Sequence, residues 1–131
     1  MQLNIMNYES FIENLMDAEP AVFGAAVISS KGELVYQTEN WDLSQELGSL
    51  VNAIAEAKQP NGQNPGRLEI MKVTYMIVEF TPERIIATNV ARKGHIIVAI
   101  DRGGALVTFI DPQKGPRDVL FNVQNFARQI Q

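Results

Sequence analysis

Cysteine is absent from the 131-residue chain, which excludes disulfide bonds and any metal or redox site built on thiolates. Histidine occurs once, as His95, so the chain lacks the ligand set of a typical zinc site. No apolar run approaches the roughly 18 residues of a membrane-spanning helix. The first residues also lack the charged and then apolar pattern of a secretory signal. We therefore expect a cytoplasmic protein that needs no cofactor.

Catalytic signatures are missing as well. There is no Gly-x-Ser-x-Gly elbow, and although Gly62 and Gly66 lie in one loop, no Gly-Lys-Ser/Thr phosphate-binding sequence follows them. The carboxylates form no distinctive pair, and His95 lies in an apolar, strand-like segment, which is typical of a half-buried structural histidine. We interpret the chain as a binding module and not an enzyme.

Composition indicates one globular domain over residues 1–131, with 46% hydrophobic and 20% charged residues. The net charge of −4 argues against nucleic-acid binding. The charge is uneven: residues 1–90 hold 12 acidic and 5 basic side chains (−7), whereas residues 91–131 hold 3 acidic and 6 basic ones (+3). This imbalance favours an acidic partner for the last third, although basic residues scattered over the surface would give the same count.

The first periodic segment predicts an amphipathic helix over residues 7–18. Its apolar side chains recur with helical spacing on one face and are, in order, Tyr8, Phe11, Ile12, Leu15 and Met16. Pro20 prevents the helix from continuing. Residues 21–29 then read as a strand, and a turn at 30–32 returns the chain into a second strand over 33–38.

The rest of the chain alternates further helical and strand-like patterns. We expect a helix over 42–57 capped by Asp42 and Gln45 and an exposed loop over 58–66. Strand-like segments follow near 67–80 (two strands or one bent strand), 84–90, 94–101 and 104–110, and Pro116 begins a closing helix over 116–130. The order helix, hairpin, helix, meander, helix predicts the α+β class, with a single antiparallel sheet and helices on both faces.

Several of these segments resemble the profilin family. The resembling segments are Tyr8-Glu-Ser-Phe-Ile-Glu-Asn-Leu-Met16, Ala25-Ala-Val-Ile28, Leu34-Val-Tyr36, Val73-Thr-Tyr-Met-Ile77, Gly94-His-Ile-Ile-Val-Ala-Ile100 and Arg102 to Val107. Gly115 and the closing helix complete a resemblance that spans essentially the whole chain and is similar to a divergent, archaeal type of profilin.

The resemblance implies an α/β sandwich whose N- and C-terminal helices share one face of the sheet, with the middle helix on the other. It implies a monomeric, cytoskeleton-associated protein that binds actin monomers and regulates actin polymerisation. The implied actin-binding residues are Lys72, Arg92, Lys93, Lys114, Gly115, Arg117, Asp118 and Asn122.

The family also binds proline-rich peptides, and the resemblance places Tyr8, Phe11, Tyr36 and Phe126 at that site. Aromatic rings suit proline rings, and a polyproline II helix is preformed. However, the family often carries His and Tyr in its last helix, where this chain has Asn125 and Phe126, and helical aromatics such as Tyr8 and Phe11 also serve as core. The chain's acidity and its lack of clustered Lys and Arg argue against phosphoinositide binding.

A second family has the same element order. The segment Val22-Phe-Gly-Ala-Ala-Val-Ile28, with Lys31-Gly32 after it, resembles roadblock/LC7 domains. That resemblance implies a homodimeric scaffold that regulates a small GTPase, and it is the alternative to an actin-binding function.

Overall fold

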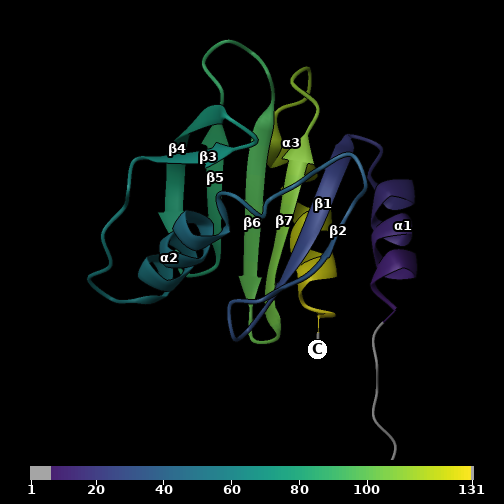
Figure 1. The fold of residues 1–131 in the computed structure, drawn as a ribbon. Coiled ribbons are helices and arrows are strands. Elements are labelled where there is room, and N and C mark those ends of the chain that lie inside the picture. The colour runs from purple at the N-terminus through teal and green to yellow at the C-terminus, as the bar shows by residue number, and fades with distance from the viewer. Residues whose placement is uncertain (1–6, 131) are drawn as a thin grey trace, which may run out of the picture.

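The computed structural model describes residues 7–130 and arranges them as three layers (Figure 1). In chain order the elements are α1 (Tyr8–Ala18), β1 (Val22–Ser29), β2 (Leu34–Gln37), α2 (Leu47–Lys58), β3 (Arg67–Ile70), β4 (Val73–Thr81), β5 (Arg84–Thr88), β6 (His95–Asp101), β7 (Gly104–Ile110) and α3 (Pro116–Ala127). None of the helices within this described part is long and apolar enough to cross a membrane.

All seven strands form one antiparallel sheet in the order β2-β1-β7-β6-β5-β4-β3. Strands β3 to β7 lie beside one another in chain order, so this part of the sheet is the expected meander. The first hairpin adds to it through β1, whose residues from Val22 to Ser29 pair along the full length of β7. The sheet therefore places β1, from the early part of the chain, beside β7, from its late part.

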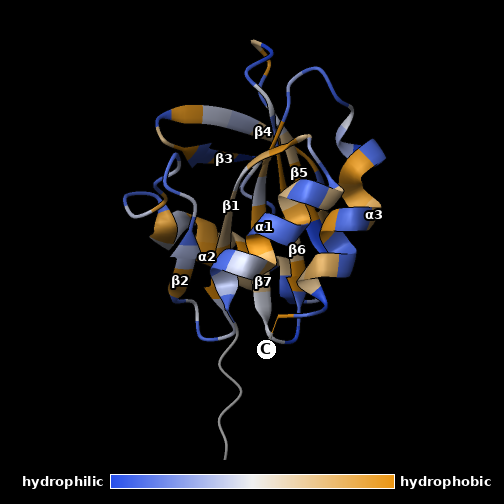
Figure 2. Ribbon diagram, turned by 90° about the vertical axis from the view of Figure 1, so that its right-hand side faces the viewer, coloured by the Kyte–Doolittle hydropathy of each residue, from blue (hydrophilic) through white to orange (hydrophobic). Residues whose placement is uncertain are grey.

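Each face of the sheet has its own core. The α2 side contains buried side chains of α2 and of strands across the sheet, including Leu50, Ile54, Tyr75 and Val98. The other side contains buried side chains of α1 and α3, including Leu15 and Val123, packed on strand residues such as Ile97. The expected sandwich, with the terminal helices on one face, is confirmed (Figure 2).

The terminal helices lie antiparallel against each other. The Phe11 and Phe126 rings have centroids 5.7 Å apart, and the Asn122 amide donates a hydrogen bond of 2.9 Å to Glu19 at the far end of α1. The Asn7 side chain caps α1 by accepting from the Ser10 amide at 3.1 Å, and Pro116 begins α3 as expected.

The predicted start of the second helix is wrong. Asp42 accepts hydrogen bonds from the Ser44 amide at 3.0 Å and the Ser44 hydroxyl at 2.6 Å, so it closes a local turn instead of capping a helix. Gln45 lies in that turn region, and α2 begins only at Leu47, with no side-chain cap. Leu43 is nevertheless buried, because the turn folds it onto the same core.

Of the two expected readings of residues 67–80, the two-strand one is confirmed, because β3 and β4 are joined by a tight turn at Met71 and Lys72. The last helix ends at Ala127, three residues before its expected end at 130, although Ile130 is still buried against the core.

Candidate functional site

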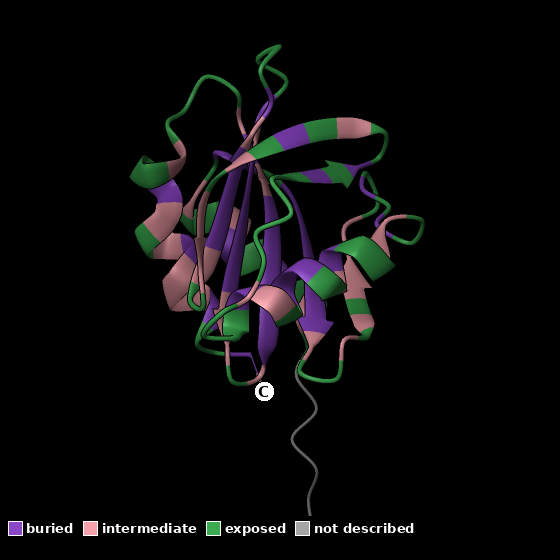
Figure 3. Cartoon of the chain, turned by 90° about the vertical axis from the view of Figure 1, so that its left-hand side faces the viewer, coloured by how far each residue is buried: buried purple, intermediate pink, exposed green. Residues whose placement is uncertain are grey.

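Part of the sheet face that carries α1 and α3, over β3 and β4, is left uncovered. The core on that side includes buried residues of β1, β5, β6 and β7 but none of β3 or β4. Because side chains alternate along a strand, Tyr75 of β4 points to the α2 side while Thr74 and Met76 point to the uncovered side. Figure 3 shows this edge of the sheet, with α3 and α2 on opposite sides of it.

Large apolar side chains lie exposed on this uncovered part. Met76 is 45% exposed and Val78 is 62% exposed on β4, and Phe121 is 72% exposed on α3. Val78 and Glu79 lie at an irregularity in the β4–β5 register, between Ile77 and Phe80, which both pack toward α2. The bulge therefore turns Val78 and Glu79 together away from the α2 side.

We call this surface the open face and define it by its residues. They are Thr74, Met76, Val78, Glu79, Arg117 and Phe121. Phe121 follows Arg117 by four residues, so both lie on the same side of α3.

Glu79 ties the open face to α3. Its carboxylate accepts from the guanidinium groups of both Arg84, on β5, and Arg117, in the first turn of α3. The hydrogen bond from Arg117 is the main cause that lowers the pKa of Glu79 below its ordinary value, and Arg84 adds to the effect. Glu79 therefore stays ionised at neutral pH and fixes the edge of α3 against β4.

The expected basic residues gather at one end of the sheet. Lys72 lies in the β3–β4 turn, Arg92 and Lys93 lie between β5 and β6, and Lys114 lies between β7 and α3. Because consecutive strands are antiparallel, these connections share the end that is uppermost in Figure 1. We call these four exposed side chains the basic border of the open face; Lys72 lies on its α2 side, where it lines a hollow with Asp42 and Glu46.

The turn that holds Lys72 has an unusual backbone. Met71 and Lys72 have φ angles of +50° and +67°, the left-handed conformation that a two-residue hairpin needs and that usually selects Asn or Gly. The Met71 amide donates to Glu46 at 3.0 Å, which ties the turn to the start of α2. This contact helps to hold Lys72 in place.

A buried asparagine organises the loop that holds Arg92 and Lys93. The Asn89 side-chain oxygen accepts from the Ala91 amide at 2.8 Å and the Lys93 amide at 3.1 Å, and its nitrogen donates to the Thr74 carbonyl at 2.8 Å. These bonds connect the loop to β4. Asn89 therefore positions Lys93 beside the open face without being exposed itself.

The remaining predicted actin-binding residues divide between two sides of α3. Gly115 precedes the helix, and a side chain there would approach the Asp118 carboxylate to 3.1 Å. Arg117 faces β4, whereas the Asn122 amide is engaged by Glu19 on the α1 side. The structure thus brings Arg117 to the open face and places Asn122 at the contact between the terminal helices.

The four predicted proline-binding aromatics also gather. Tyr8, Tyr36 and Phe126 are half-buried against the core on the α1 and α3 side of the sheet. Phe11 is only 6% exposed. Burial, followed by the carboxylates of Glu9, Glu13 and Glu39, raises the pKa of the Tyr36 hydroxyl. Phe11 has almost no free ring surface, so any ligand would meet the other three side chains.

His95 has a structural partner. Its Nδ1 lies 2.9 Å from the Thr88 hydroxyl on the neighbouring strand, and the side chain is half-buried. Within residues 7–130, no three His, Asp or Glu side chains are grouped closely enough to hold a metal ion.

Sequence reasoning missed the apolar part and the fixing residues of this site. Met76 and Val78 lie in a strand-like apolar run and look like core, and Phe121 falls outside the apolar stripe expected for its helix. The position of Phe121 off that stripe was the one available signal. Glu79 and Asn89 were also missed, because their contacts with Arg117 and Thr74 join residues 38 and 15 positions apart in the sequence.

Taken together, the fold and the open face define a small α+β protein with one exposed apolar sheet surface beside the edge of α3. No family model matches the chain. Individual proteins do: Loki profilin-1 of Lokiarchaeum sp. (strain GC14_75) is 40% identical over 125 residues, which cover 93% of both sequences. Loki profilin-2 of the same organism is 39% identical over 126 residues, again 93% of both.

Solved structures agree with the sequence comparison. The structure of LokiProfilin1 in complex with rabbit actin matches with a TM-score of 0.84 at 40% identity, and that of LokiProfilin2 with rabbit actin matches at 0.83 and 39%. Both cover 95% of this chain and of the profilin. The chain belongs to the profilin family, a family of binding proteins and not of enzymes.

The roadblock/LC7 alternative shares only the fold. A roadblock/LC7 domain from Streptomyces avermitillis matches with a TM-score of 0.57 at 13% identity, over 94% of this chain and 97% of the other. The common element order explains why both families were suggested by the sequence.

Proposed function

We propose that this profilin binds actin monomers through the open face and its basic border, and thereby regulates actin polymerisation. The observation that carries the proposal is the uncovered part of the sheet, where Met76 and Val78 are exposed on β4 and Phe121 is exposed on α3. The proposal is supported by the two Loki profilins whose structures were solved with rabbit actin.

The two parts of the surface would contribute differently. A specific protein interface buries about 1,600 Å² and depends on a few well-packed apolar or aromatic anchors near its centre. Met76, Val78 and Phe121 are suited to that role. The basic border lies at the rim, where each charge contributes only about 0–1 kcal/mol and mainly steers an acidic partner into place.

Polymerisation of pyrene-labelled actin tests the proposal directly. A bound profilin occupies one face of the monomer, so nucleation should slow and the lag should lengthen as protein is added. An unchanged lag at large molar excess, with rabbit actin and with an archaeal actin, would contradict the proposal.

Charge reversal tests the basic border separately. Lys93→Glu combined with Lys114→Glu should slow association with actin, most clearly at low salt, where screening is weakest. Arg117 is left intact because its guanidinium is paired with Glu79. The matched control, Lys31→Glu with Lys58→Glu, makes the same change in net charge at the other end of the sheet. Equal slowing by both pairs would show that only net charge matters.

A second candidate function is the binding of proline-rich peptides between the terminal helices. The gathering of Tyr8, Tyr36 and Phe126 over the buried Phe11 favours it. Calorimetric titration with a polyproline peptide should show binding that Tyr8→Ala weakens while actin binding is spared. Phe23→Ala is the control, since Phe23 is an exposed aromatic that packs near Phe109 instead. Equal weakening by both variants would remove this candidate.

The proposed acting form is a cytoplasmic monomer associated with the actin cytoskeleton. Light scattering on purified protein should give the mass of one chain, and a stable dimer at working concentration would contradict this form.

A further inference from the structure

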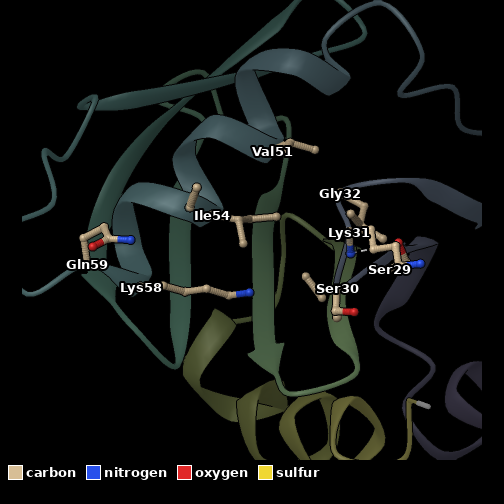
Figure 4. Close-up of a pocket in the computed structure, with 12 residues that line it drawn as sticks. Ser29, Ser30, Lys31, Gly32, Val51, Ile54, Lys58 and Gln59 are labelled. Atoms are coloured by element: carbon tan, nitrogen blue, oxygen red, sulfur yellow. Dashed lines mark hydrogen bonds between the residues drawn. The ribbon is translucent and has the colours of Figure 1, made fainter.

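A hollow of about 290 Å³ lies at the end of the sheet opposite the basic border. Three segments enclose it: the β1–β2 turn, the last turns of α2 and the start of β7 (Figure 4). Its size is at the lower end of the range for small-molecule pockets. The hollow shares no lining residue with the open face or with the aromatic cluster.

The inner wall of the hollow is apolar. Ile28, Ile54 and Ala105 line it and belong to the α2-side core, and Val51 packs against the same core. Figure 4 shows Val51 and Ile54 on the side of α2 that borders the hollow. Such a wall favours a ligand with an apolar body, because burying apolar surface is favourable.

The rim of the hollow is positively charged. Lys31 comes from the β1–β2 turn and Lys58 from the end of α2, and no Asp or Glu is among the 12 lining residues. Neither lysine forms an ion pair with any residue between 7 and 130. Residues 1–90 carry 12 acidic and only 5 basic side chains. Two of those five basic side chains nevertheless line the same hollow, which no carboxylate lines.

Packing fixes the walls of the hollow in place. The Ser29 hydroxyl accepts from the amides of Lys31 and Glu33, both at 3.2 Å, and so holds the turn closed. Gly32, at φ +82°, lies so close to α2 that an added Cβ would be 3.1 Å from Val51. On the third wall, a Cβ at Gly104 would collide with the Ile28 carbonyl oxygen at 2.1 Å. The hollow is therefore preformed, which lowers the ordering cost of binding.

From this geometry we infer that the hollow binds a small anion with an apolar body, of the chemistry of a medium-chain carboxylate. The charged group lies between Lys31 and Lys58, and the apolar body lies along Val51 and Ile54. A cavity of about 150 Å³ holds benzene, so this hollow accommodates roughly a dozen non-hydrogen atoms. The inference is independent of actin binding, because the two surfaces lie at opposite ends.

Calorimetric titration of the full chain with octanoate tests the inference. Octanoate combines the charge with the apolar body, whereas acetate lacks the body, 1-octanol lacks the charge and inorganic phosphate supplies only an anion. We expect octanoate to bind and each of the other three to bind at least about fivefold more weakly. Equal affinity for phosphate or acetate would mean a simple anion site and would overturn the inference, as would the absence of octanoate binding.

Two variants locate the binding. Lys58→Gln should weaken octanoate about threefold to fivefold, the range for a solvent-exposed ion pair. Ala55→Phe, at an exposed helix position that lines the hollow, should fill it and abolish binding. Lys93→Gln is the matched control, because it removes one charge at the other end of the sheet and should change nothing. Octanoate binding that survives Ala55→Phe in protein with an unchanged unfolding midpoint would overturn the inference.

Discussion

The sheet face that carries α1 and α3 has a covered part and an open part. In the covered part, Ile97 and Leu106 are fully buried beneath the terminal helices. In the open part, Met76 and Val78 project from the same face of the sheet, yet they are 45% and 62% exposed, because neither α1 nor α3 covers β3 and β4 on this face. An exposed apolar cluster of this kind marks an interaction surface, since a monomer gains nothing by leaving it in water.

Two phenylalanine side chains, Phe11 and Phe121, show the same contrast between the covered and the open part. Phe11 of α1 packs against Phe126 of α3 with 6% of its surface exposed, while Phe121 of α3 lies on the open face with 72% exposed. The first therefore contributes mainly to folding and the second mainly to binding. Substitutions at these two positions should separate the two roles.

The largest effect is expected for Phe11→Ala. Removing a buried aromatic ring that contacts Phe126 should lower the free energy of unfolding by about 3 kcal/mol. Phe121→Ala, the same substitution at an exposed position, should change it by less than about 0.5 kcal/mol. Urea unfolding followed by circular dichroism measures both. Similar losses for the two variants would show that Phe121 also supports the fold.

The next effect concerns binding. Phe121→Ala should reduce the affinity for actin about thirtyfold, or about 2 kcal/mol, which is typical of an aromatic anchor in a protein interface. Fluorescence titration against labelled actin monomers measures it. Phe23→Ala, which removes an exposed ring that packs near Phe109, is the control and should bind normally. Normal binding by Phe121→Ala would move the interface away from the open face.

Local patterns were enough to predict much of the fold. The spacing of apolar residues and the Pro20 stop located α1, and Pro116 located the start of α3, because these signals act within one or two helical turns. Strand β7 was expected over 104–110 and spans Gly104–Ile110. The cap at Asp42 failed because a side-chain hydrogen bond to Ser44 competes with helix initiation at the same position.

The candidate site was less accessible to sequence reasoning. Strand alternation shows which side chains share a face, but it does not show whether a helix covers that face. Val78 and Met76 therefore read as core. The link between Glu79 and Arg117 spans 38 residues and could be seen only in the folded chain. The basic border was expected in part because the late charge excess is visible by counting, although Lys72 lies outside that excess.

The smallest effect is expected for Glu79→Gln, which removes the carboxylate that joins the open face to α3. Glu79 is ionised in the folded state and its partner Arg117 is largely exposed, so the loss at neutral pH should be below about 1 kcal/mol. Its pKa is lowered from the ordinary value of 4.5, so its stabilising contribution is complete above pH 4.5 and is lost as the pH falls through the lower, folded-state pKa.

The difference in unfolding free energy between the native protein and Glu79→Gln should therefore shrink as the pH is lowered below 4.5, which urea unfolding at several pH values would show. Combining Glu79→Gln with Arg117→Gln measures how much of the lost unfolding free energy depends on the interaction between these two side chains. If Glu79 acts mainly by holding Arg117, the double variant should be little less stable than either single one, because the second substitution removes an interaction already lost. Strictly additive losses would mean that Glu79 stabilises the sheet mainly through Arg84, leaving the edge of α3 unfixed beside the open face.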